Sequence, residues 1–215
     1  MVKNPGNTNY ILASASPRRK ELIRLLGIDA RIVPSTIEEQ TDTRDPEQLV
    51  LSLSLGKALD VASRFHEDGI VIGADTCVYL PDVLREGEPC AAGEGIILGK
   101  PSSEEDARRM LALLSGRTHR VYTGVTLVRI TEEREPAEAP HSFVEETFVT
   151  VSPLTKDEID AYVAGKEPMD KAGAYGIQGE FARFITRISG DYTNVVGLPV
   201  GRLYQELKRF TGGTP

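Results

Sequence analysis

Two short segments far apart in the chain carry residue types suited to binding phosphate. The first, residues 12–19, runs from an apolar stretch into serines, a proline and the pair Arg18–Arg19. The second, residues 170–179, places lysine, tyrosine and glutamine among three glycines. A strand that leads into a helix directs backbone N–H groups and a positive dipole at an anion, and arginine binds phosphate through paired hydrogen bonds. The two segments suggest an enzyme that acts on a phosphorylated small molecule.

Between these segments, Asp75 follows the apolar run 70–72 and is expected at the end of a strand. Carboxylates at the carboxyl ends of strands in α/β sheets commonly face the ligand. Such an acid can take a proton from water or hold a metal ion. Glu38 and Glu39 can supply further oxygens, because Mg²⁺ prefers a few carboxylates plus substrate phosphates. On these residues alone, non-catalytic alternatives stay open. Asp75 can be a turn aspartate, and Glu38 and Glu39 can belong to an acidic loop in water.

Several lysines and one amide complete the set of candidate binding residues. The stretch Gly99–Pro101 is not a P-loop, because Glu94 and Pro101 stand where that motif needs glycine and a hydroxyl residue. Lys57 and Lys100 can still act as point charges for phosphate, although single lysines are usually solvated. Gln178 offers a donor and an acceptor together, as the reading of a base edge requires.

Composition limits the classes of partner. The chain has 215 residues, a formal net charge of -7 and a sequence pI near 5.1, which argues against binding to nucleic-acid backbones. Two cysteines give no disulfide framework. The polar N-terminus lacks an apolar signal core, and no apolar run approaches the roughly 18 residues of a membrane span. These features predict a cytoplasmic protein without a membrane or nucleic-acid partner.

The apolar periodicity predicts an α/β protein with a mixed sheet, because helices alternate with strands early and long neighbouring strands come late. A capping box formed by Ser102 and Glu105 is expected to begin a helix that ends at residue 114, and Thr155 with Glu158 begins another. The expected strands cover residues 10–13, 31–34, 70–75 with 77–80, 119–130, 142–151 and 181–188. The other expected helices begin at residues 16, 47 and 200.

Taken together, the segments closely resemble the Maf family of nucleoside triphosphate pyrophosphatases, named for septum-formation inhibition. The long run at residues 170–179 makes chance agreement very unlikely, and the matches occur in family order over nearly the whole chain. The matching stretches are residues 12–19, 73–76, 98–101, 114–116, 122–124, 170–179 and 196–199.

The resemblance implies a single Maf-like domain over residues 1–215, with an elongated mixed β-sheet, flanking helices and two lobes around a cleft, similar to inosine triphosphate pyrophosphatases. It implies hydrolysis of a nucleoside triphosphate to the monophosphate and pyrophosphate with a divalent cation, Mg²⁺ or Mn²⁺. Asp75 resembles the family's proton acceptor. Asp75 and Glu39 resemble the family's metal ligands. The matching positions that line the family's cleft are Ser14, Arg18, Glu39, Lys57 and Lys100.

The resemblance also implies a base preference. Arg18, Thr76 and Gln178 match the subgroup that acts on dTTP and UTP. The chain departs from the family pattern at residues 81–95, which are longer than the usual turn. A homodimer is compatible with the sequence. The alternative from another class is a non-catalytic nucleotide-binding regulator of cell division, which would not need Asp75.

Overall fold

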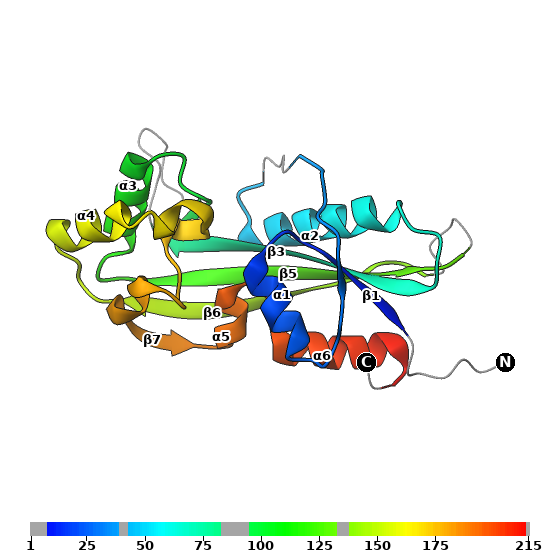
Figure 1. Ribbon diagram of the computed structural model, residues 1–215. Helices are drawn as coiled ribbons and strands as arrows, with labels where there is room; N and C mark the ends of the chain where they lie inside the picture. The colour runs from blue at the N-terminus through cyan, green and yellow to red at the C-terminus, as the bar shows by residue number, and fades with distance from the viewer. Residues whose placement is uncertain (1–7, 39–42, 83–94, 133–137, 214–215) are drawn as a thin grey trace. The chain divides into compact units, whose positions relative to one another are not determined.

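A mixed β-sheet organises the chain. The computed structural model describes residues 8–38, 43–82, 95–132 and 138–213. In this part of the chain seven strands form one sheet in the order β2-β1-β3-β5-β6-β7, with β4 paired to β3 (Figure 1). Strand β1 runs parallel to β2 and β3, whereas β4 is antiparallel to β3 and β7 is antiparallel to β6. The predicted mixed α/β sheet is therefore confirmed.

The strands and helices follow in an order that alternates early. The strands are β1 (Asn9–Ala13), β2 (Arg31–Ile32), β3 (Gly69–Pro81), β4 (Gly95–Leu98), β5 (Thr118–Ile130), β6 (His141–Val151) and β7 (Ile185–Ser189). The helices are α1 (Pro17–Arg24), α2 (Pro46–Ala62), α3 (Glu104–Leu114), α4 (Lys156–Ala164), α5 (Tyr192–Val196) and α6 (Val200–Thr211). Three short 3₁₀ helices are η1 (Glu167–Asp170), η2 (Ala172–Ala174) and η3 (Glu180–Phe184). No described helix is both long and apolar enough to cross a membrane.

The structure corrects two of the expected element starts. The cap of α3 is Ser103, whose side chain accepts from Asp106 N, whereas Ser102 donates to the Asp106 carboxylate. The expected strand 181–188 begins as the 3₁₀ helix η3, because Phe181 and Phe184 turn inward and pack against one another with ring centroids 5.4 Å apart. The capping box of α4 at Thr155 and Glu158 is confirmed.

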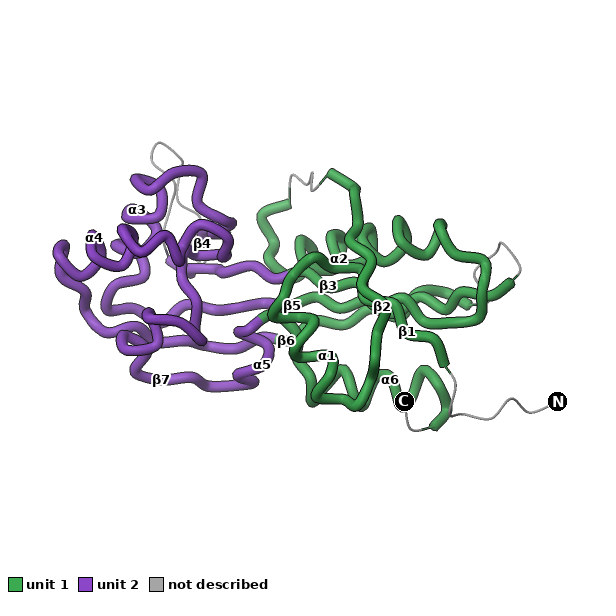
Figure 2. Tube along the Cα trace, in the orientation of Figure 1, with its two compact units in different colours: residues 1–75, 123–145, 197–215 green, residues 76–122, 146–196 purple. Residues whose placement is uncertain are grey.

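The described residues fall into two compact units, each with its own core (Figure 2). Unit 1 comprises residues 1–75, 123–145 and 197–215, and unit 2 comprises residues 76–122 and 146–196. In unit 1, apolar side chains of β1, β3 and β5 pack against α2, with Ala58 and Val61 fully buried. In unit 2, the rings of Tyr162, Tyr175 and Phe184 surround Phe181 at centroid distances of 5.0–5.4 Å.

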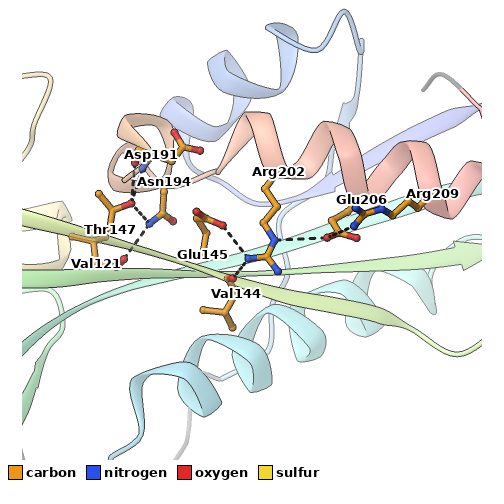
Figure 3. A network of polar contacts seen from close by, with 9 residues as sticks. All are labelled: Val121, Val144, Glu145, Thr147, Asp191, Asn194, Arg202, Glu206 and Arg209. Atoms are coloured by element: carbon orange, nitrogen blue, oxygen red, sulfur yellow. Dashed lines mark hydrogen bonds and ion pairs between the residues drawn. The ribbon is translucent and has the colours of Figure 1, made fainter. Parts of the chain in front are cut away.

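In unit 1, α6 is fastened to β6 by a charged network (Figure 3). The guanidinium of Arg202 donates to the Val144 carbonyl at 2.6 Å and to Glu145 at 3.0 Å. Glu206, which is 7% exposed, lies between Arg202 and Arg209. Charged groups of opposite sign thus hold the helix against the strand where its polar face meets the sheet.

In unit 2, the buried amide of Asn194 holds α5 against the sheet. Its Nδ2 donates to the Val121 carbonyl at 3.1 Å and to Thr147 Oγ1 at 3.0 Å (Figure 3). The Thr147 hydroxyl also donates to the Asp191 carbonyl at 3.1 Å. The short helix α5 is therefore fixed to both β5 and β6 by hydrogen bonds that are shielded from water.

Candidate active site

A buried ion pair in unit 1 is the centre of the candidate site. Asp75 is 8% exposed, and its Oδ1 accepts a hydrogen bond from Lys57 Nζ on α2 at 2.5 Å. Helix α2 reaches β3 because residue 73 has no side chain: a Cβ there would collide with the Ser54 carbonyl and with Ala58. The sequence predicts Lys57 as a charge for phosphate and does not predict its pairing with Asp75. The structure brings it to the acid.

The expectation that Asp75 ends a strand is wrong. Strand β3 continues from Gly69 to Pro81, so Asp75 lies near its middle. Sheet partners before and after Asp75 explain the continuation of the strand. Before it, β1 pairs with residues 69–73, and after it, β4 pairs with residues 78–81. Sheet partners remote in sequence supply hydrogen bonds that a short apolar run does not reveal.

Ser14 lies one strand away from Asp75. Strands β1 and β3 are parallel with Ala13 opposite Gly73, so Ser14 leaves β1 beside the stretch of β3 that carries the acid. The Ser14 side chain is buried, and its hydroxyl accepts from Ser16 N at 3.2 Å. Ser16 in turn caps α1 by accepting from the backbone N–H of Arg19. The predicted strand-to-helix junction is thus confirmed as a local structure.

An arginine that the site prediction left out is tied to this junction. Arg19 donates from its guanidinium to Ser14 Oγ at 3.4 Å and to the Gly197 carbonyl at 2.8 Å. The sequence showed two adjacent arginines, of which only Arg18 was assigned to substrate. Helical geometry decides between neighbours, because adjacent residues point about 100° apart around the axis. Arg18 is half-buried in the same turn.

In unit 2, a backbone hydrogen bond joins the two other candidate segments. Gly173 N donates to the Gly99 carbonyl at 3.0 Å, which places the segment 170–179 beside Lys100. Gly173 has a φ of +68°, and its Cα lies against Val78, so a side chain here would be strained and crowded. Lys100 and Gln178 are both exposed.

Thr76 belongs to the same part of unit 2. Side chains alternate along a strand, so Thr76 shares a face of β3 with Val78, which packs against Gly173.

Two buried rings anchor the glycine-rich segment. Tyr175 OH lies 2.8 Å from His119 Nε2 on β5, and the His119 side chain is fully buried. Burial lowers the pKa of His119 to about 3 and raises the pKa of Tyr175. Both groups are therefore neutral near pH 7. Lys171, the lysine of the same segment, donates to the Glu167 carbonyl and to Asp170, each at 2.6 Å.

Of the two expected metal ligands, the structure describes only Asp75. Asp75 offers an anionic oxygen donor of the kind that Mg²⁺ and Mn²⁺ take. Glu39 lies outside the described residues, as do residues 83–94 of the expected long insertion. Within the described ranges no three carboxylate, thiol or imidazole side chains gather around one point.

Comparison with known proteins finds similarity over nearly the whole chain. The family described as "Maf-like protein" matches residues 9–210. A protein of Lachnoclostridium phytofermentans named "dTTP/UTP pyrophosphatase" is 48% identical over 200 residues, which cover 93% of this chain and 94% of that protein. A protein of Agathobacter rectalis with the same name is 50% identical over 214 residues, which cover 94% of this chain and 97% of that protein.

A solved structure supports the fold. The structure of a HAM1 protein from Coxiella burnetii matches 94% of this chain and 100% of that one with a TM-score of 0.51 and 15% identity. At this identity the likeness concerns the fold alone. The family match and the two relatives extend over nearly all of the described elements, and the chain therefore belongs to the Maf family.

Proposed function

We propose that this protein hydrolyses nucleoside triphosphates, preferentially dTTP and UTP, to the nucleoside monophosphate and pyrophosphate. The observation that carries the proposal is the buried Asp75–Lys57 pair, set in β3 beside the Ser14 junction. A purely structural sheet has little reason to bury charges of this kind, because burying them costs several kcal/mol each. The names of its close relatives supply the reaction and the bases.

The chemistry follows from the residue types. Asp75 accepts a proton from a water molecule, and the water oxygen bonds to the α-phosphorus. The bond from that phosphorus to its bridging oxygen breaks, and pyrophosphate leaves with the bonding electrons. Lys57 holds the carboxylate in place before the reaction, while Ser14, Arg18 and Lys100 bind phosphate oxygens. Positioned charges are the main catalytic means in such transfers.

A divalent cation, Mg²⁺ or Mn²⁺, fits the carboxylate of Asp75, which would hold it together with Glu39. One or two carboxylates plus substrate phosphates are the usual protein ligands of Mg²⁺. When bound, the cation neutralises phosphate charge.

The base is read by Gln178 and Thr76 of unit 2 together with Arg18. The Gln178 amide carries a donor and an acceptor, which can pair with the adjacent acceptor and donor of uracil or thymine. Exposure of Gln178 leaves its amide accessible to a ligand. A site of paired hydrogen bonds rejects a mismatched base strongly, because its own polar groups are left unpaired.

We further infer that the chain acts as one Maf-like domain with two lobes, in the cytoplasm where nucleotide substrates are found, and as a homodimer. Light scattering of the purified protein measures the mass in solution directly. A monomeric mass would exclude the dimer and leave the reaction unaffected.

The reaction is tested with the purified protein, a panel of nucleoside triphosphates and either Mg²⁺ or Mn²⁺. Release of pyrophosphate and monophosphate, fastest with dTTP and UTP, is expected. Release of orthophosphate would indicate a different bond cleavage. Binding of nucleotide without any product would instead favour the non-catalytic regulator.

A further inference from the structure

A single carboxylate in unit 2, that of Glu167, holds the turn that carries Gln178. Glu167 begins η1, directly after α4 and its loop. Its Oε1 accepts a hydrogen bond from Tyr162 OH at 3.0 Å, and its Oε2 accepts from the backbone N–H of Glu180 at 3.0 Å. The second bond ties Glu167 to the residue that follows the glycine-rich segment.

The other end of the turn is tied to the same carboxylate through Tyr162. The Tyr162 hydroxyl accepts from Gly176 N at 3.3 Å while it donates to Glu167. Within the turn, Gly179 N donates to the Gly176 carbonyl at 3.2 Å. Gln178 therefore sits in a short turn whose two ends, at residues 176 and 180, are linked to one side chain.

The glycines of this turn are explained by the space that the carboxylate occupies. A Cβ on Gly179 would collide with the carboxylate carbon and both oxygens of Glu167. A Cβ on Gly176 would lie 3.1 Å from Glu167 Oε1 and 2.7 Å from Lys171 Cε. The backbone of the turn thus lies directly on the Glu167 carboxylate.

We propose that Glu167 is a positioning residue for base selection: it fixes the turn 176–180 and so the direction in which Gln178 offers its amide to a uracil or thymine edge. This inference rests on the proposed function. Glu167 acts through the turn and needs no contact with the nucleotide. Selectivity by paired hydrogen bonds depends on angle, since a hydrogen bond weakens steeply as its angle bends.

The charge state of Glu167 matters as well as its shape. Two acceptor oxygens meet two donors, the Tyr162 hydroxyl and the Glu180 N–H. In Glu167→Gln one acceptor becomes an amide donor of almost the same size, so the negative charge and one of the two acceptor oxygens are lost. Hydrogen bonds to a charged group are worth more than neutral ones, and their loss is expected to loosen the turn without emptying any space.

The test compares the full-length wild type with Glu167→Gln and with the matched control Glu180→Gln, whose side chain is exposed and whose backbone N–H is retained. Steady-state kcat/KM is measured for dTTP, UTP and CTP. In Glu167→Gln the ratio of dTTP to CTP is expected to fall about tenfold, with the CTP value within about twofold of wild type. The control is expected to keep the wild-type ratio.

A second readout does not depend on turnover. Amide hydrogen exchange at Gly176 and Glu180, measured without nucleotide, is expected to accelerate in Glu167→Gln, because Glu167 holds the Glu180 N–H directly and the Gly176 N–H through Tyr162. Gly179→Ala is a second variant, which keeps the carboxylate but pushes it away. It is expected to give the same two effects, whereas Gly201→Ala, with open space around its Cβ, is expected to give neither.

Unchanged exchange, an unchanged dTTP to CTP ratio, or an equal loss with all three nucleotides in a folded Glu167→Gln would overturn the inference. Failure of the proposed function looks different. In that case the wild type itself shows no preference for dTTP and UTP or releases no pyrophosphate.

Discussion

Lys57 Nζ lies 2.5 Å from Asp75 Oδ1, and each side chain is 12% exposed. The two residues are 18 positions apart, one on α2 and one in the middle of β3. Near-burial makes the pair sensitive to the loss of either member, because a charge left alone in a poorly hydrated site is costly.

Asp75→Asn is expected to lower kcat for dTTP by about 10²- to 10⁴-fold, the usual cost of losing a general base. The amide keeps the shape and can still accept from Lys57, so the variant is expected to fold, with a lowered melting temperature because the lysine charge loses its partner. The control is Asp60→Asn, which removes a carboxylate of α2 that binds Ser35 and Arg64. This variant is expected to keep the wild-type kcat. A folded Asp75→Asn with near wild-type turnover would exclude Asp75 as the base.

Lys57→Met and Asp75→Asn are expected to be non-additive. Residues that act as a unit cost about as much singly as together, so the double variant should be little slower than Asp75→Asn alone. The measurement is kcat/KM for dTTP in all four members of the cycle. Additive losses would mean that Lys57 acts on the substrate independently of the acid.

Arg18→Ala and Lys100→Ala are each expected to lower kcat/KM about 10- to 150-fold, since each removes a charge-assisted contact worth roughly 1.5–3 kcal/mol. The effect should appear with every nucleotide, because phosphate is common to all of them. Lys20→Ala, an exposed cation on the same helix as Arg18, controls for overall charge. Wild-type kinetics in both variants would contradict the phosphate assignment.

Gln178→Ala is expected to flatten the preference for dTTP and UTP more than it lowers the rate with CTP. An exposed residue has little effect on folding, so the melting temperature is a sufficient control for the structure. Comparable kcat/KM for dTTP, UTP, GTP and ATP in the wild type would show that this site does not select the base.

Acid is expected to destabilise the fold through His119. Its pKa is about 3 in the folded protein and near 6.5 in the unfolded chain, so its contribution to stability is complete above pH 6.5 and is lost as the pH falls toward 3. His119→Gln should therefore show a shallower fall of unfolding free energy between pH 6.5 and 4, measured by urea titration.

The control for that experiment is His66→Gln, which changes an exposed histidine on a loop. It should follow the wild-type curve. A slope in His119→Gln equal to that of the wild type would mean that His119 takes up its proton equally in both states.

The local features of the fold were predictable because they depend on neighbouring residues. The start of α1 at Ser16 and Pro17 and the capping box of Thr155 and Glu158 follow from side chains that reach backbone groups two or three positions away. The α3 cap was misplaced by one residue. Ser102 and Ser103 are adjacent and both can cap, and the choice between them depends on which hydroxyl meets the N–H of Asp106.

The sequence by itself determined the mixed α/β sheet, the order of the motifs and, through resemblance, the Maf family. Tertiary structure alone decided that Asp75 lies inside a strand, that Lys57 pairs with it, that Arg19 donates to Ser14, and that Glu167 underlies the turn of Gln178. The physical reason is that motif and periodicity report contacts within a few residues. The Lys57–Asp75 ion pair and the hydrogen bond from Arg19 to the Gly197 carbonyl join residues 18 and 178 positions apart, whose meeting depends on how the whole chain packs.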